Sequence, residues 1–332
     1  MRRRARYAQG MVCFTVLASG SKGNCTVVTG GRTRILVDAG LSCRELFRRM
    51  QLAGEDPAKL DAILVTHEHQ DHVNGVAVTA RKLGIPVYFT EGTHRAWMRW
   101  LMPRRQMSYA QWLEAAAAAR QQAAARQAEA VASEGEPDEG EISAEAAAEP
   151  EPAAAEPAEP AKDPTWLPAV EYFAPGEPFR IGDIAVSPFT IPHDAADPVG
   201  FVLEAEGVRM AVATDLGYMP PNVKEQLKAL DLLMLESNHD LEMLRDGPYP
   251  WSVKQRVLSR VGHLSNDAAA GFLEEEYDGQ AAYVILGHLS ESNNLPDLAR
   301  VAAERALANH ASLLANRLLL AGQHEPLHPI YF

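Results

Sequence analysis

The sequence predicts an α/β (α+β) protein in which two β-sheets pack together with helices on their outer faces. Short runs of β-branched and apolar residues, typical of strands, occur in two separate groups, and segments with helical patterning follow each group. The 332 residues are 47% hydrophobic and 23% charged, which is the balance of a globular protein with a large core. No repeat of about 20 to 50 residues is visible, so a repeat architecture is not expected.

The first group of strands lies before residue 91. Glycine and serine turns separate three short strands, and a later buried strand leads into a polar loop rich in histidine. Helices are expected where apolar residues recur at helical spacing. In order, the predicted elements are strands at 12–19, 25–30 and 33–40, a helix at 44–53, a strand at 61–69, a helix at 76–83 and a strand at 86–90.

The second group begins near residue 179. Its middle part contains the pair Glu206 and Gly207, which predicts a hairpin turn between two strands. The predicted strands lie within 179–193, 200–215, 231–239 and 281–288. The predicted helices lie at 253–261, 266–277 and 295–309.

A long segment of low complexity separates the two groups. Twelve of the 23 residues at 110–132 are alanine, which favours a helix but offers almost nothing large to bury. The next stretch, 133–161, is rich in Glu, Pro and Ala and contains ten acidic residues and no basic one. We therefore expect a disordered or partly helical insertion at 104–164 within a single domain at 11–332, preceded by an N-terminal extension at 1–10.

Charge and cysteine content narrow the class of protein. The net charge of -13 comes largely from the insertion, so the charge of the remaining chain neither supports nor excludes a phosphate-bearing substrate. No window approaches the roughly 18 to 20 apolar residues of a membrane span, and residues 1–10 lack the apolar stretch of a secretory signal. The 3 cysteines form no CxxC pair, which indicates neither a disulfide framework nor a thiolate zinc site. A cytoplasmic protein without membrane association is expected.

The motif with the most chemical information is the loop 67–72, which follows the apolar strand AILVT. It contains three histidines and an aspartate, namely His67, His69, Asp71 and His72. Nitrogen and oxygen donors of this kind suit zinc, manganese or iron, and one ion cannot easily use all of them. Clustered histidines also occur in surface loops that bind metal adventitiously, but a motif that emerges from a buried strand favours a two-metal hydrolytic site.

The pattern HxHxDH is the signature of the metallo-β-lactamase fold superfamily, which the chain resembles. The resemblance implies a four-layer αββα sandwich with a dinuclear site, and it implies further ligands at the ends of apolar strands. Taken singly, such an Asp is usually a turn residue and such a His a satisfied polar group, but these matches occur in the expected order. They are His193 for the first ion, Asp215 as the bridging carboxylate, His288 for the second ion and Asp38 as a support behind the histidine loop.

Several longer words are similar to the YycJ/WalJ-like branch of this superfamily. They include LASGSKGNC (17–25), HDAADPVGF (193–201), ESNHD (236–240), GPYPWSVKQRV (247–257) and LGHLSESNN (286–294). The resemblance implies a relation to phosphodiesterases such as ribonuclease Z, and a DNA 5′ to 3′ exonuclease connected with DNA mismatch repair. The insertion after Trp97 departs from the pattern, which has only a short connection there.

Four features near these words are open to two interpretations. The turn at 19–24 is either an anion-binding loop or a plain connection. His239 either assists at the substrate phosphate or makes a local hydrogen bond, and His263 either contacts substrate or ends a helix. Lys254 and Arg256 either hold a nucleic-acid backbone or face water. The word GHLS occurs twice, and His288 is the expected ligand because it follows a buried strand, whereas His263 follows a helix.

The function expected from this resemblance is hydrolysis of a nucleic-acid phosphodiester, with DNA favoured, by a hydroxide that bridges two divalent ions. Asp71 and Asp215, with His239 and His263, are the expected catalytic residues. The alternative is a small-molecule ester or thioester hydrolase of the glyoxalase II or lactonase kind. A metal-retaining binding module is a further possibility, against which stands the complete ligand set. The metal ions are expected to be zinc or manganese, with iron as a third option.

Overall fold

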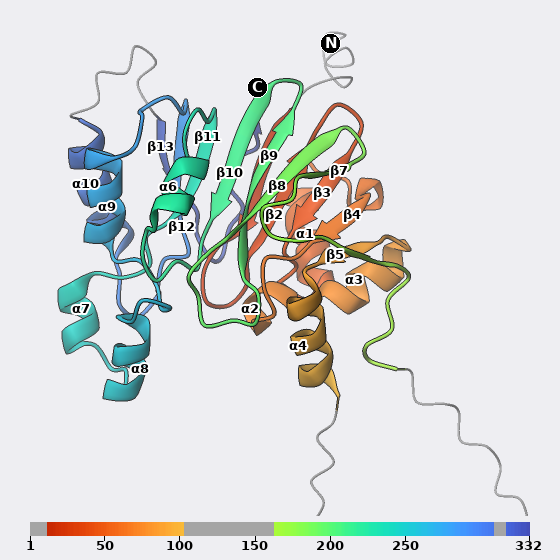
Figure 1. Cartoon of the computed structure of the whole chain (residues 1–332), viewed down its shortest axis with the longest axis horizontal. Helices are drawn as coiled ribbons and strands as arrows, with labels where there is room; N and C mark the ends of the chain where they lie inside the picture. Colours follow the sequence, from red (N-terminus) through yellow and green to blue (C-terminus); the bar gives the residue numbers. More distant parts are fainter. Residues whose placement is uncertain (1–11, 103–162, 309–316) are drawn as a thin grey trace, which may run out of the picture. The chain divides into compact units, whose positions relative to one another are not determined.

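The computed structural model describes residues 12–102, 163–308 and 317–332, which form two seven-stranded mixed sheets (Figure 1). The first sheet has the order β14-β1-β2-β3-β4-β5-β6 and the second the order β13-β12-β11-β10-β9-β8-β7. The strands of the first sheet are β1 (Cys13–Ala18), β2 (Cys25–Thr29), β3 (Arg34–Val37), β4 (Ala62–Leu64), β5 (Val87–Phe89), β6 (Val170–Tyr172) and β14 (Ile330–Tyr331). Those of the second are β7 (Phe179–Ile181), β8 (Ile184–Thr190), β9 (Val199–Ala205), β10 (Val208–Ala213), β11 (Leu232–Glu236), β12 (Tyr283–Gly287) and β13 (Arg317–Leu320).

The helices form the outer layers and the rim. Figure 1 shows α1 and α3 beside the first sheet, and α9 and α10 beside the second. The helices are α1 (Cys43–Leu52), the 3-10 helix η1 (Pro57–Lys59), α2 (Gln70–Val73), α3 (Val76–Leu83), α4 (Glu91–Leu101), α6 (Pro221–Gln226), α7 (Leu241–Asp246), α8 (Trp251–Val257), α9 (Asn266–Glu275) and α10 (Pro296–Leu307).

Alternation along the strands produces three buried apolar layers. In β2, Val28 packs between the two sheets with residues such as Phe201, whereas Val27 faces outward into the cluster that Leu46 of α1 completes. On the other side, the outer face of the second sheet packs against α9 and α10, with Phe272 in that cluster. Successive strand residues point to opposite faces, so each sheet is apolar on both sides. The expected αββα sandwich is confirmed.

Most predicted elements are present with shifted ends. The hairpin turn is confirmed, because Glu206 and Gly207 both have positive φ (50° and 81°) between the paired strands β9 and β10. The strand predicted at 61–69 is shorter, since β4 ends at Leu64 and the chain then turns into the histidine loop. The elements that the sequence analysis missed are α2, α4, α6, α7, η1, β6, β13 and β14.

Some expectations lie outside the described residues. The extension at 1–10 and all but the end of the insertion at 104–164 are not described, so the division into domains remains a prediction. Within the described ranges, no helix is both long and apolar enough to cross a bilayer.

The strand directions determine where the functional side chains gather. In the first sheet β3 and β4 are parallel, and in the second β10, β11 and β12 are parallel. Parallel strands end at the same edge of their sheet, so the residues that follow them are neighbours in space although distant in sequence. The residues that follow the strands are Asp38, His67, Asp215 and His288, and Glu236 is the last residue of β11 at the same edge.

Candidate metal centre

Asp38 supports the histidine loop through contacts with Thr66 and His72. Its carboxylate accepts hydrogen bonds from the Thr66 backbone N–H (2.8 Å) and the Thr66 hydroxyl (2.9 Å), and lies 2.7 Å from Nδ1 of His72. Because Nδ1 of His72 is used in this way, Nε2 is the ring atom presented to the site. Burial raises the pKa of the Asp38 carboxyl, and the adjacent His72 opposes that shift.

One group of donor atoms consists of three histidines. Ligand atoms of His67, His69 and His193 all lie within 4.8 Å of one another. His193 uses Nδ1 toward the Gly262 carbonyl oxygen (3.1 Å), so its Nε2 faces Nδ1 of His69 at 3.2 Å. His67 is fully buried and its Nε2 has no hydrogen-bond partner. Converging nitrogens with an unpartnered buried atom among them fit a cation.

A second group of donor atoms consists of one carboxylate and two histidines. Ligand atoms of Asp71, His72 and His288 all lie within 4.8 Å of one another. The Asp71 carboxylate oxygen Oδ2 lies 3.5 Å from Nε2 of His72 and 3.4 Å from Nε2 of His288. The Nε2 atom of His288 is buried without a hydrogen-bond partner. This group therefore offers two nitrogens and one carboxylate to a second cation.

Asp215 lies between the two groups. Its Oδ2 is 3.3 Å from Nε2 of His72, and its Oδ1 is 3.2 Å from Nδ1 of His288 and 3.9 Å from Nε2 of His193. The backbone supports this position, since Asp215 (φ 63°), Asp38 (φ 58°) and His288 (φ 55°) all adopt the left-handed conformation within two residues of the end of a strand. Such conformations are costly for residues other than glycine and concentrate at functional sites.

The charges of the site favour positive charge at its centre. Burial acts to lower the pKa of His72, but the carboxylates of Asp215 and Asp38 raise that pKa well above its usual value. The opposite holds for His67, whose pKa burial lowers well below its usual value, with the charge of His72 adding to the effect. Divalent ions would supply the same positive charge that protons supply here. The donor set thus fits divalent metal ions.

Glu236, which the sequence analysis missed, organises the side of the site formed by the second sheet. Its Oε1 accepts hydrogen bonds from Nδ1 of His263 (2.8 Å) and Nδ1 of His288 (2.9 Å). Its Oε2 accepts from the backbone N–H groups of Leu216 (2.8 Å) and Leu264 (3.0 Å). Although burial raises the pKa of this carboxyl, the charge and hydrogen bond of His263 bring it to about 2. The sequence feature that could have identified Glu236 is its position as a carboxylate at the end of the apolar segment DLLMLE.

The histidines of the two GHLS words both contact the carboxylate of Glu236. The rings of His263 and His288 are 5.1 Å apart, and donor atoms of both lie with Asp215 and Glu236 in one group. The side chain of His288 is 3% exposed, whereas that of His263 is 21% exposed and lines a cleft of about 300 Å³. His263 therefore has access to a molecule bound in the cleft, as its interpretation as a substrate contact requires.

The cleft above the metal centre has one guanidinium group, that of Arg256, among the described residues of its lining. Arg256 lines it together with Ser21, His69, Asp71 and Val253, and Arg256 forms an ion pair with Asp194. Lys254 lies elsewhere, because its ammonium group donates to the Arg245 carbonyl oxygen (2.6 Å) and ties α8 to α7.

The small-residue turn at 19–24 supports the site from the first sheet. Asn24 accepts from the Gly20 N–H (2.9 Å) and its amide lies 3.2 Å from Oδ2 of Asp71, while the Ser19 hydroxyl accepts from the His288 N–H (2.7 Å). The turn thus orients two candidate ligands.

His239 lies apart from both donor groups. It is 1% exposed, and it lines a neighbouring pocket rather than the cleft. Burial lowers the pKa of His239 to about 4, so the ring is neutral at neutral pH.

We expect Gly40→Ala to weaken metal binding, although Gly40 is not itself a candidate ligand. A Cβ at Gly40 would lie 1.6 Å from the carbonyl oxygen of Asp71 and 2.6 Å from the backbone nitrogen of Asn24, so the Asp71 loop must move. Bound metal, measured by plasma mass spectrometry, should fall together with the melting temperature. The control is Gly271→Ala, since a Cβ at that helical position meets nothing within 4 Å. Equal metal content in both variants would contradict this account.

The fold and the site define a metal-dependent hydrolase, and the chain belongs to the metallo-beta-lactamase superfamily, whose family model matches residues 18–288. Among characterised proteins it is 33% identical to exodeoxyribonuclease YycJ of Bacillus anthracis, over 89% of this chain and 88% of that protein. It is 30% identical to exodeoxyribonuclease WalJ of Streptococcus pneumoniae over the same shares. Among solved structures it is similar to the metallo-beta-lactamase fold protein YhfI of Bacillus subtilis, with a TM-score of 0.56 and 13% identity over 96% of this chain and 99% of that one.

Proposed function

We propose that this protein is a phosphodiesterase that acts on nucleic acid, with DNA favoured, and that it removes nucleotides in the 5′ to 3′ direction. The names of the two curated relatives support a DNA substrate, since both are exodeoxyribonucleases that align over 88% of their length. We assign one ion to His67, His69 and His193 and the other to Asp71, His72 and His288, with Asp215 shared between them. Two divalent ions held in this way would lower the pKa of a bound water and would neutralise charge that develops on a phosphoryl group.

The observation that carries the proposal is His263 at the wall of the cleft, held by the buried carboxylate of Glu236. Glu236 accepts from Nδ1 of His263 and so fixes the ring, which leaves Nε2 for a molecule in the cleft. The leaving oxygen of a DNA phosphodiester is a poor leaving group unless it is protonated, so a positioned histidine has a clear use there. A thioester, whose leaving sulfur is a stable anion, needs no such donor.

Other side chains have roles that follow from their positions. Asp71 lies at the rim of the cleft, where it can hold a proton from the attacking water in addition to its contact with His72. Arg256 lines the cleft and is paired with Asp194, so its guanidinium group is placed where it can orient a phosphate.

The test is release of label from 5′-labelled duplex DNA by protein loaded with manganese or zinc. Metal-dependent release, absent from an Asp215→Ala control, is the expected result. Parallel reactions contain RNA, a glutathione thioester and a lactone. If the thioester or the lactone is hydrolysed and neither nucleic acid is, the proposal is wrong and the protein is an ester hydrolase; if RNA alone is cleaved, the preference for DNA is wrong.

A further inference from the structure

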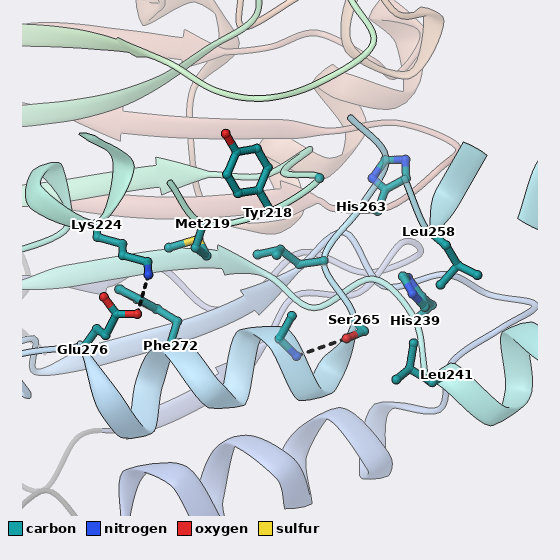
Figure 2. Close-up of a pocket in the computed structure, with 13 residues that line it drawn as sticks. Tyr218, Met219, Lys224, His239, Leu241, Leu258, His263, Ser265, Phe272 and Glu276 are labelled. Atoms are coloured by element: carbon teal, nitrogen blue, oxygen red, sulfur yellow. Dashed lines mark hydrogen bonds and ion pairs between the residues drawn. The ribbon is translucent and has the colours of Figure 1, made fainter. Parts of the chain in front are cut away.

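A second pocket lies beside the metal centre, between the loop that follows β10, the start of α7, the end of α8 and the first turns of α9. Its volume is about 320 Å³, which is within the range of pockets that hold small ligands. Figure 2 shows the ion pair of Lys224 and Glu276 at one end of this pocket, and His239 and His263 at the other. The apolar and aromatic side chains of its lining are Tyr218, Met219, Leu241, Leu258, Leu264, Ala268 and Phe272.

This pocket and the cleft above the metal centre share one lining residue. His263 lines both the pocket and the cleft that contains Asp71, Asp215 and His288. The ring of His263 is 5.1 Å from that of His193 and 5.1 Å from that of His288. A group in the pocket is therefore separated from the candidate metal ligands by a single imidazole.

The charge of the lining disfavours an anion. The ammonium group of Lys224 is paired with Glu276, and His263 is paired with the buried Glu236. His239, the remaining basic residue of the lining, is a neutral imidazole. A phosphate would find no unpaired positive charge among these residues, so the occupant is an uncharged group.

Two features indicate a planar occupant that makes hydrogen bonds. The first is Nδ1 of His239, which is buried without a hydrogen-bond partner in a side chain that is 1% exposed. A buried ring nitrogen of this kind gains a partner when a ligand brings one. The second is the set of flat or adaptable side chains along the walls, such as Phe272 and the thioether of Met219, which suit contact with an aromatic face.

We propose that this pocket binds the base of the nucleotide adjacent to the scissile phosphodiester, turned out of the stack at the end of the strand. His239 makes a hydrogen bond to the base edge, while Met219 and Phe272 contact its face. The phosphodiester then lies on the other side of His263, in the cleft. This inference rests on the proposed nuclease function and adds to it that the enzyme holds the terminal base as well as the backbone.

The test fills the pocket with a side chain that does not disturb the core. Ala268 is exposed on α9 and lines the pocket, so Ala268→Trp occupies it; Asp267→Trp, at the exposed neighbouring position outside the lining, is the matched control. The substrates are single-stranded oligonucleotides whose 5′-terminal nucleotide carries a base or is abasic. Wild type and Asp267→Trp should prefer the base-bearing substrate in kcat/KM by about tenfold or more, as expected for one stacked base. In Ala268→Trp this preference should disappear.

Calorimetry separates this inference from the nuclease proposal. The metal-loaded protein should bind deoxyadenosine 5′-monophosphate more tightly than deoxyribose 5-phosphate, and Ala268→Trp should bind the two equally. That result without cleavage of either DNA or RNA would overturn the nuclease proposal and leave the assignment of the pocket to a base standing. Cleavage by the wild type with the same kcat/KM for base-bearing and abasic ends, or an unchanged preference in Ala268→Trp, would overturn the pocket assignment alone.

Discussion

Asp215→Ala and Asp215→Asn are both expected to abolish binding of two metal ions and to reduce turnover by about 1,000-fold or more, beyond the roughly 10- to 100-fold typical of residues that only support a ligand. The reason is position, because Asp215 is the carboxylate within 4 Å of histidines from both donor groups. The neighbouring carboxylate of Glu236 is held in place by four hydrogen bonds, so it cannot take over this position without a shift of the backbone.

The two variants separate loss of metal from loss of fold. Asp215 has a φ of 63°, a conformation that costs alanine on the order of 1 kcal/mol but that asparagine tolerates. Asp215→Asn should therefore retain the circular dichroism spectrum and melt close to the metal-free wild type, yet contain at most one ion per chain. Two ions per chain with wild-type turnover in Asp215→Asn would show that the ligand assignment is wrong.

Glu236→Gln is expected to lower kcat and metal affinity each by about 10- to 100-fold, although Glu236 is not among the assigned ligands. Glu236 is fully buried, and each of its oxygens accepts two hydrogen bonds. A glutamine keeps the shape but replaces one oxygen with an NH2 group. Whichever way the amide turns, two donors lose their acceptor, at a cost of about 1–3 kcal/mol for each.

The matched control for this variant is Glu204→Gln. Glu204 is in β9 of the same sheet, and its side chain is 52% exposed beside Arg209. The two variants should differ in metal affinity measured by titration, in steady-state kinetics and in melting temperature. A Glu236→Gln protein with wild-type metal affinity would show that the hydrogen bonds to His263 and His288 do not orient the site.

The chain order alone was enough to predict most of the side chains that the structure gathers at the candidate metal centre. The six residues of the histidine loop are consecutive, and His193, Asp215 and His288 each follow an apolar strand, so a linear pattern contains them. The sandwich could be predicted for the same reason, because alternation within a strand and helical spacing are local properties of sequence. The missed strands β6, β13 and β14 are short, and pairing with a neighbour, rather than their own residues, makes them strands.

The sequence by itself therefore determined the class of fold, the family resemblance and the residues that can bind metal. Only the tertiary structure decided how those residues work together, because the decisive contacts join distant parts of the chain. Glu236 receives both His263 and His288, Asn24 meets Asp71, and Ser19 receives the N–H of His288 from 269 residues away. The pocket beside His263 is likewise built from four separate segments, none of which has a pocket-forming pattern of its own. Strand-end chemistry can be recognised locally, whereas hydrogen-bond partners depend on which ends the parallel strands bring to one edge.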